Sequence, residues 1–133
     1  MQTRKRISHT IITELQPNEI FVFGSNISGF HGGGAARTAM SWGAVWGEGV
    51  GLQGQTYAIP TMDGSVEHIK PYIDEFITFA KCRPEMQFLV TEIGCGIAGY
   101  TPQQIAPLFE NAVNVENIYL PQSFWNKLKG YLG

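Results

Sequence analysis

The sequence has 133 residues, of which 44% are hydrophobic and 15% charged, and it carries a formal net charge of -2. This length suits a single domain spanning residues 1–133, and no Pro/Ser-rich linker or block of like charges divides it. The near-neutral charge excludes the strongly basic signature of many nucleic-acid-binding proteins, and no apolar run is long enough to span a bilayer.

The N-terminal segment is basic at residues 4–6, but the apolar core of a signal peptide does not follow it. We interpret this basic segment as a solvated chain end, with a phosphate contact as the alternative. The cysteines Cys82 and Cys95 are too few for a disulfide scaffold and lack the spacing of metal ligands. These features predict a cytoplasmic protein with free thiols, no cofactor, no metal site and no membrane partner.

The first half of the chain is predicted to hold three strands and one helix. Apolar, β-branched or aromatic runs occupy residues 9–12, 20–23 and 56–59. The runs are continuous rather than alternating, which is typical of strands covered on both faces of a sheet. Residues 34–46 are small and apolar and favour a helix between the second and third runs.

The second half is predicted to alternate helices and strands. Apolar residues at helical spacing between positions 69 and 80 indicate a helix, with a break or late start at Pro71, because proline removes a backbone hydrogen bond. A strand is expected at 87–93, and the sequence TPQQ at 101–104 has the N-cap, first-turn proline and capping-box glutamine of a helix start. A strand at 117–120 and a short helix after Pro121, ending near Gly130, complete the chain.

Strands that alternate with helices predict an α/β fold, a three-layer α/β/α sandwich with a central mixed, mostly parallel sheet. Ligands of such sheets bind outside the carboxyl ends of the strands. Glycine clusters follow the predicted strands at 20–23 and 87–93. We therefore expect both glycine loops at the ligand-binding edge of the sheet.

The two glycine loops have the form of anion-binding turns. A glycine-rich turn between a strand and a helix exposes backbone N–H groups and places a helix N-terminus beside them, which suits phosphate. The first loop matches neither the spacing of the dinucleotide-binding motif nor that of the Walker P-loop. Tight turns and close helix packing are the alternative explanation for its glycines. A second loop of the same form strengthens the prediction, because two cradles can hold one diphosphate from both sides.

The sequence resembles the macrodomain family, α/β/α modules that bind ADP-ribose. FGSNISGFHGGGAA is similar to the family's VNAAN..LxGGGGVxG, EIGCGIAGYTP is similar to AISTGIYGYP, and YAIPT stands where the family has its VIHTV-like strand. The resemblance covers residues 20–109. It implies that the partner is an ADP-ribose-like nucleotide or an ADP-ribosylated macromolecule.

The resemblance also implies the binding residues. Asn26 falls on the asparagine that contacts the ribose next to the diphosphate, although a turn residue bonded to its own backbone is the alternative. Tyr100 resembles the aromatic residue that covers the distal ribose, the ribose that carries no adenine. The remaining implied ligand-binding residues are Gly32, Gly33, Gly34 and Ala35 in the first loop and Gly94, Cys95, Gly96, Ile97, Ala98 and Gly99 in the second.

The sequence departs from the family's pattern at two positions. The aspartate that reads the adenine amino group has no clear equivalent upstream of the first loop. The aspartate that orients a water in hydrolytic members is replaced by Ala36. Adenine recognition and hydrolysis by the usual route are therefore not predicted by the resemblance.

His31, Asp63 and Glu92 are the candidate catalytic residues. His31 precedes the glycines as a possible base or phosphate contact, or as a cap on a neighbouring carbonyl. Asp63 and Glu92 follow predicted strands and could orient a water, or make ordinary loop contacts. Cys95 could be a nucleophile, but no base partner is identifiable, so a small loop residue is the favoured interpretation. Tryptophans are expected mainly in the core rather than stacked on a base.

Three functions remain open from the sequence. The leading one is binding of ADP-ribose or a related nucleotide diphosphate-ribose through the two glycine loops. The second is a hydrolase that removes ADP-ribosyl groups or cleaves a related phosphoribose ester. The third is a protein-interaction module with a vestigial cleft, against which the intact Asn26 and both loops argue.

Overall fold

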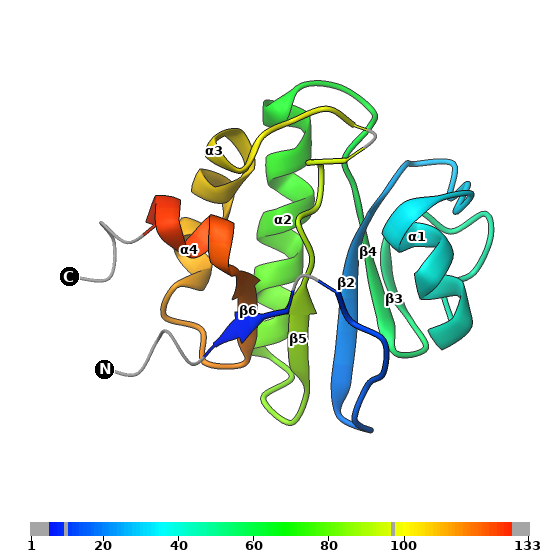
Figure 1. Cartoon of the computed structure of the whole chain (residues 1–133), viewed down its shortest axis with the longest axis horizontal. Helices are drawn as coiled ribbons and strands as arrows, with labels where there is room; N and C mark the ends of the chain where they lie inside the picture. The colour runs from blue at the N-terminus through cyan, green and yellow to red at the C-terminus, as the bar shows by residue number, and fades with distance from the viewer. Residues whose placement is uncertain (1–5, 10, 97, 129–133) are drawn as a thin grey trace.

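The computed structural model describes residues 6–9, 11–96 and 98–128, and these form an α/β fold with a mixed six-stranded sheet (Figure 1). The sheet order is β1-β6-β5-β2-β4-β3, and β3 and β4 form the antiparallel pair among otherwise parallel neighbours. The strands are β1 (Ile7–Ser8), β2 (Glu19–Ser25), β3 (Gly51–Gln53), β4 (Thr56–Pro60), β5 (Gln87–Val90) and β6 (Ile118–Pro121).

The described residues also form four α-helices and two 3-10 segments. These are α1 (Gly34–Ala39), η2 (Met40–Trp42), α2 (Val66–Lys81), α3 (Pro102–Ile105), η3 (Ala106–Ala112) and α4 (Gln122–Leu128). The predicted start of α3 is confirmed, because Thr101 and Gln104 form a reciprocal capping box. The helix after Pro121 is also confirmed, whereas its predicted end near Gly130 lies outside the described residues.

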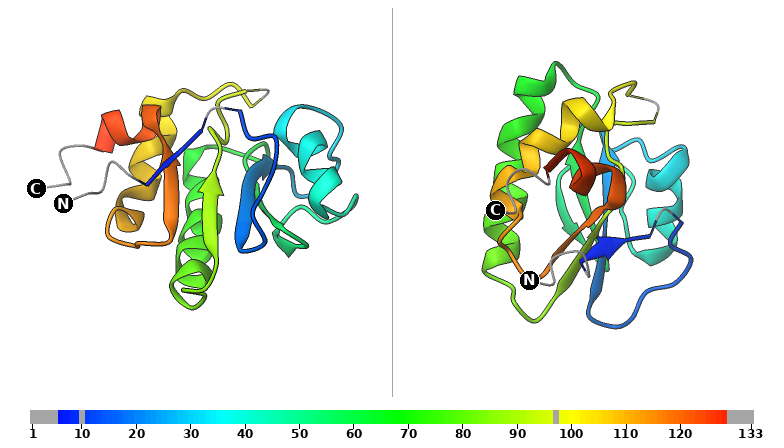
Figure 2. Two further views of the ribbon diagram at one scale, coloured as in Figure 1. Left: turned by 60° about the horizontal axis from the view of Figure 1, so that its bottom comes forward. Right: turned by 60° about the vertical axis from the view of Figure 1, so that its left-hand side comes forward.

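The central strand β2 is covered on both faces. Its alternate residues Ile20 and Val22 belong to a core cluster that includes α2, while Phe21 and Phe23 pack in a second cluster with α1. Figure 2 shows α1 and α2 on opposite sides of the strands. Each fully buried aliphatic or aromatic side chain contributes about 1.5–3 kcal/mol. The continuous apolar run at 20–23 is thus explained by two buried faces.

Several predicted boundaries are wrong. The strand expected at 9–12 is β1 at Ile7–Ser8, and the strand expected at 87–93 ends at Val90. The helix expected over 34–46 is shorter, because η2 ends at Trp42. The next residue, Gly43, has a φ of 114, in the left-handed region. The short edge strand β3 was not predicted, because its three residues lack an apolar run.

The prediction of a break at Pro71 is also wrong, because α2 runs without interruption from Val66 to Lys81. Because Pro71 has no N–H, the Glu67 carbonyl loses its helical hydrogen bond. Both residues are exposed. Water can therefore satisfy that carbonyl. The buried face of α2 carries Ile73 and Phe76, and its packing outweighs the lost hydrogen bond.

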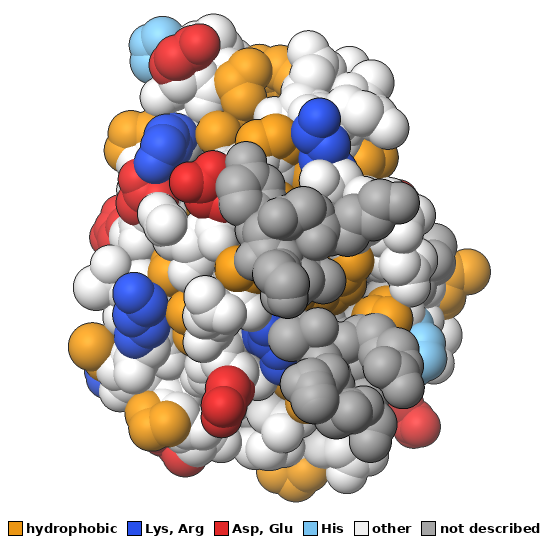
Figure 3. Space-filling view, turned by 90° about the vertical axis from the view of Figure 1, so that its left-hand side faces the viewer, with side chains coloured by type: hydrophobic (Ala, Val, Ile, Leu, Met, Phe, Trp, Pro, Cys, Tyr) orange, Lys and Arg blue, Asp and Glu red, His pale blue; other side chains and the backbone are white. Residues whose placement is uncertain are grey.

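Arg6 has a structural role. Its guanidinium donates to the backbone carbonyls of Val113, Val115 and Ile118 and lies 5.2 Å from the centre of the Trp125 ring. The phosphate-contact alternative is therefore not favoured for Arg6, and the rest of the basic segment lies outside the described residues. Figure 3 shows one face of the molecule, on which the described basic and acidic side chains are scattered without one dominant charged patch.

Candidate functional site

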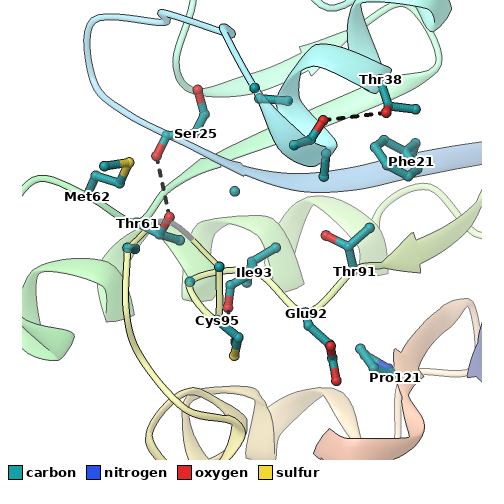
Figure 4. Close-up of a pocket in the computed structure, with 18 of the residues that line it drawn as sticks. Phe21, Ser25, Thr38, Thr61, Met62, Thr91, Glu92, Ile93, Cys95 and Pro121 are labelled. Carbon is teal, nitrogen blue, oxygen red and sulfur yellow. Dashed lines mark hydrogen bonds between the residues drawn. The ribbon is translucent and has the colours of Figure 1, made fainter. Parts of the chain in front are cut away.

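A cleft of about 480 Å³ opens at the carboxyl ends of β2, β4, β5 and β6 (Figure 4). The cleft is lined by Ser25 at the end of β2 and Asn26 directly after it, by Thr61 after β4, by Ile93 after β5, and by Pro121 at the end of β6. Parallel strands end at one edge of a sheet, so segments that are distant in sequence meet there. Both glycine loops line this one cleft.

The first glycine loop leads into α1. Gly33, Gly34, Ala35 and Ala36 line the cleft, and Gly33 is the N-cap of the helix without a side-chain hydrogen bond. The first N–H groups of a helix have no intrahelical partner, so they are available to a ligand. Gly34 has a φ of +58, which favours glycine. Gly32 is exposed and is not among the cleft-lining residues.

The second glycine loop closes the opposite wall. Gly94, Cys95, Gly96 and Ala98 line the cleft, whereas Gly99 and Tyr100 do not, and Ile97 lies outside the described residues. A Cβ at Gly94 would approach the Ile105 side chain to 3.0 Å, so this glycine permits close packing on α3. A Cβ at Gly96 would meet no atom within 4 Å, so the space beside it is free for a ligand.

Tyr100 anchors the second loop. Its hydroxyl donates to the carbonyl of Gly64 at 2.7 Å, and its ring packs against the main core. These contacts tie the second loop to the segment before α2. The covering role over the distal ribose that the resemblance implies for Tyr100 would require the ring to leave this position.

Asn26 lines the cleft and braces its own loop. The side-chain Oδ1 accepts from the Phe30 N–H at 3.0 Å, and Nδ2 donates to the Phe30 carbonyl at 3.2 Å. An amide group has two N–H donors and two lone pairs, so half of its hydrogen-bonding capacity remains. The turn interpretation is confirmed, and it leaves the amide able to bind a ribose hydroxyl as well.

His31 is buried, with 2% of its surface exposed. Its Nε2 donates to the Glu48 carbonyl at 3.1 Å, and in that tautomer Nδ1 accepts from the Ser25 hydroxyl, also at 3.1 Å. The ring therefore joins the first loop to the segment before β3. Both ring nitrogens are engaged, and His31 does not line the cleft.

Asp63 braces the first loop from outside the cleft. Its Oδ2 accepts from the Ile27 N–H at 2.7 Å. It lines a separate, smaller hollow with Ile27 and the start of α2. This position makes Asp63 a loop contact rather than a group that faces the two glycine loops.

Glu92 lies at the far end of the cleft. Figure 4 shows it beside Pro121, away from Ser25 and Met62. The carboxylate accepts from the Ser123 hydroxyl at 2.5 Å. His31, Asp63 and Glu92 are thus not brought together into one catalytic group.

Cys95 carries a neutral thiol at physiological pH. Burial raises the pKa of Cys95 to about 11, and the charge of Glu92 adds to this effect. A thiol becomes a strong nucleophile when its pKa is lowered, which is the opposite direction. The interpretation of Cys95 as a loop residue is therefore favoured.

Sequence reasoning missed the two apolar ends of the cleft. Phe30 and Met62 lie at the Asn26 end, Pro121 lies beside Glu92 at the other end, and Ile11 and Ile12 also line the cleft. No motif marks these residues, because they come from separate segments of the chain. Phe30 stands between Asn26 and His31 in sequence, and this neighbourhood is the one signal that could have identified it.

The described walls of the cleft contain no lysine or arginine. An anion there would be bound by backbone N–H groups rather than by basic side chains. Residues 6–9, 11–96 and 98–128 hold no cluster of His, Cys, Asp or Glu side chains fit for a metal ion. Within the same ranges, no helix combines the length and apolar character needed to traverse a membrane.

Comparison of the chain with protein-family models, with curated proteins and with solved structures finds no match.

Proposed function

We propose that this protein binds ADP-ribose or a related nucleotide diphosphate-ribose, as a divergent macrodomain-like module of three α/β/α layers. The observation that carries the proposal is the convergence of two glycine loops on one cleft without a lysine or arginine among its described walls. Glycine loops bring backbone donors close to a diphosphate, since no Cβ keeps the ligand away. The cleft volume of about 480 Å³ lies in the usual range of small-molecule sites.

The two ends of the cleft give the ligand a direction. We place the diphosphate between Gly33–Ala35 and the second loop, and the distal ribose beside the free half of the Asn26 amide. The base then occupies the end where Pro121 and Glu92 lie side by side (Figure 4). The apolar ring of Pro121 can cover one side of the base, and the Glu92 carboxylate can accept from an exocyclic amine. This carboxylate would also repel a phosphate, which favours the same direction.

Binding is favoured over hydrolysis. A general base must reach the proton it abstracts, directly or through one water. At the Asn26 end, both nitrogens of His31 are engaged and Asp63 lies outside the cleft. Glu92 lies at the opposite end, beside Pro121.

The test is calorimetric titration and thermal unfolding with ADP-ribose, for the wild type and Gly96→Val. Gly96 lines the cleft, a Cβ there would overlap no neighbouring atom, and the backbone is not in the left-handed region, so a valine adds bulk at the cleft without disturbing the loop. A ligand at 100 times its Kd stabilises the fold by about 2.7 kcal/mol, which raises Tm by several degrees. We expect this shift in the wild type and its loss in Gly96→Val.

The control is Thr78→Val, which places the same valine side chain at an exposed position of α2 that does not line the cleft. It should keep the wild-type heat and Tm shift. Absence of both signals in the wild type would overturn the proposal and favour an interaction module instead. Unchanged affinity of Gly96→Val would show that the ligand does not occupy this cleft.

A further inference from the structure

Two stacked aromatic rings stand at the Asn26 end of the cleft. Phe30 is 60% exposed and Trp46 is 55% exposed, although large aromatic side chains are usually buried. Their ring centres are 5.5 Å apart and their planes differ by 21°. Phe30 lines the cleft, whereas Trp46 does not. One face of the Phe30 ring is therefore covered by Trp46, and the exposure of Phe30 leaves the other face open.

The loops that carry this pair are braced. The Asn26 side chain holds both backbone polar groups of Phe30. Gly47 donates its N–H to the Gly29 carbonyl at 2.9 Å, and a Cβ at Gly29 would overlap the backbone of Gly47 and Glu48. Close approach of two backbones thus sets the position of both rings. A ring held in place loses little entropy when a planar group stacks on it.

We propose that the Phe30 ring, backed by Trp46, is a stacking platform for a second planar heteroaromatic ring carried by the distal ribose. The inference rests on the proposed function, because the Asn26 amide that would hold this ribose is hydrogen-bonded to the backbone of Phe30. It makes a dinucleotide, rather than ADP-ribose alone, the best ligand of the cleft. Aromatic faces attract cations, so a positively charged pyridinium ring suits the platform well.

The surroundings of the pair favour a ring over a charged substituent. Ile27 and Val45 are exposed apolar residues of the same two loops, and Glu48 in the second of these loops is acidic. An anionic group would therefore meet apolar surface and a carboxylate. A flat cationic or neutral ring would meet an aromatic face instead.

The experiment compares ADP-ribose with NAD, which carries a nicotinamide ring on the distal ribose, by calorimetric titration of the full chain. Stacking of a ring on an aromatic side chain changes affinity by about fivefold or more. We expect the wild type to bind NAD at least about fivefold more tightly than ADP-ribose. Phe30→Leu keeps an apolar side chain without a flat face, and it should bring this ratio close to one.

Trp46→Leu removes the backing ring and should lower the ratio. Leu52→Ala is the matched control, because Leu52 is exposed on the edge strand β3 and does not line the cleft. Saturation-transfer NMR on the wild type needs no variant and should show strong transfer to the nicotinamide protons.

The outcomes separate the two proposals. If the wild type binds ADP-ribose and NAD equally, or if Phe30→Leu keeps the wild-type ratio, the platform is overturned and the proposed function stands. Weak saturation of the nicotinamide protons overturns the platform as well. If neither nucleotide binds the wild type, both proposals fail together.

Discussion

Replacement of His31 by alanine tests whether this residue stabilises the fold or takes part in chemistry. The ring bridges the Ser25 hydroxyl and the Glu48 carbonyl, each at 3.1 Å, and packs edge-on against Phe23 with ring centres 5.3 Å apart. If these contacts are its function, His31→Ala should weaken the fold and leave no separate catalytic defect.

The expected loss of unfolding free energy is about 2–4 kcal/mol. A hydrogen bond contributes about 0.5–1.5 kcal/mol net, so two bonds account for about 1–3 kcal/mol. The Glu48 carbonyl also accepts from the Gln53 side chain at 2.9 Å, so it is not left without a partner. This second bond favours the lower half of the range for the two hydrogen bonds. Loss of a buried ring and the cavity left behind add about 1–2 kcal/mol.

Urea unfolding followed by tryptophan fluorescence and circular dichroism measures the change. His9→Ala is the control, because His9 is exposed and its replacement should change the free energy by less than about 0.5 kcal/mol. A loss below about 0.5 kcal/mol in His31→Ala would refute the structural role. If His31→Ala kept its stability but lost turnover of an ADP-ribosylated substrate, His31 would be a catalytic residue.

Two further predictions concern the chain terminus and the second loop. Arg6→Ala should lower the unfolding free energy by about 2–4 kcal/mol in urea, because three backbone carbonyls lose a charged donor. Lys81→Ala, at an exposed position, should change the unfolding free energy little. Equal losses in the two variants would contradict the structural role of Arg6. At pH 8, iodoacetamide should modify the exposed Cys82 first, because a pKa of about 11 leaves roughly one Cys95 thiol in a thousand ionised. Peptide mass spectrometry reads both sites, and equal rates would show that the Cys95 pKa is not raised.

Local patterns predicted the elements that have strong local causes. The run at 20–23 is apolar at every residue because β2 is covered on both faces, so burial leaves a continuous signal in the sequence. The start of α3 was predicted from Thr101 and Gln104, whose capping box satisfies backbone groups within four residues. Pro71 misled the prediction because local propensity ignores the packing of Ile73 and Phe76 on the sheet.

The sequence predicted that the two glycine loops lie together at the cleft, but not the contacts of the side chains around them. Glycines mark both loops in the sequence, because close approach of backbone to a ligand or a neighbour needs the missing Cβ. The roles of Asn26 and His31 depend on partners in folded loops, and their alternatives stayed open until those partners were known. Phe30 and Trp46 are separated by a helix in the sequence, so nothing local predicts that their rings stack.

By itself the sequence determined the alternation of strands and helices and the two glycine loops at strand ends, because periodicity, capping and glycine content are properties of neighbouring residues. Tertiary structure decided which side chains face the cleft. It placed Glu92 at one end with Pro121 and Phe30 at the other with Asn26, and it turned His31 and Asp63 into braces of the first loop. The physical reason is that parallel strands bring distant segments to one edge of the sheet, where the partners of each polar group come from other parts of the chain.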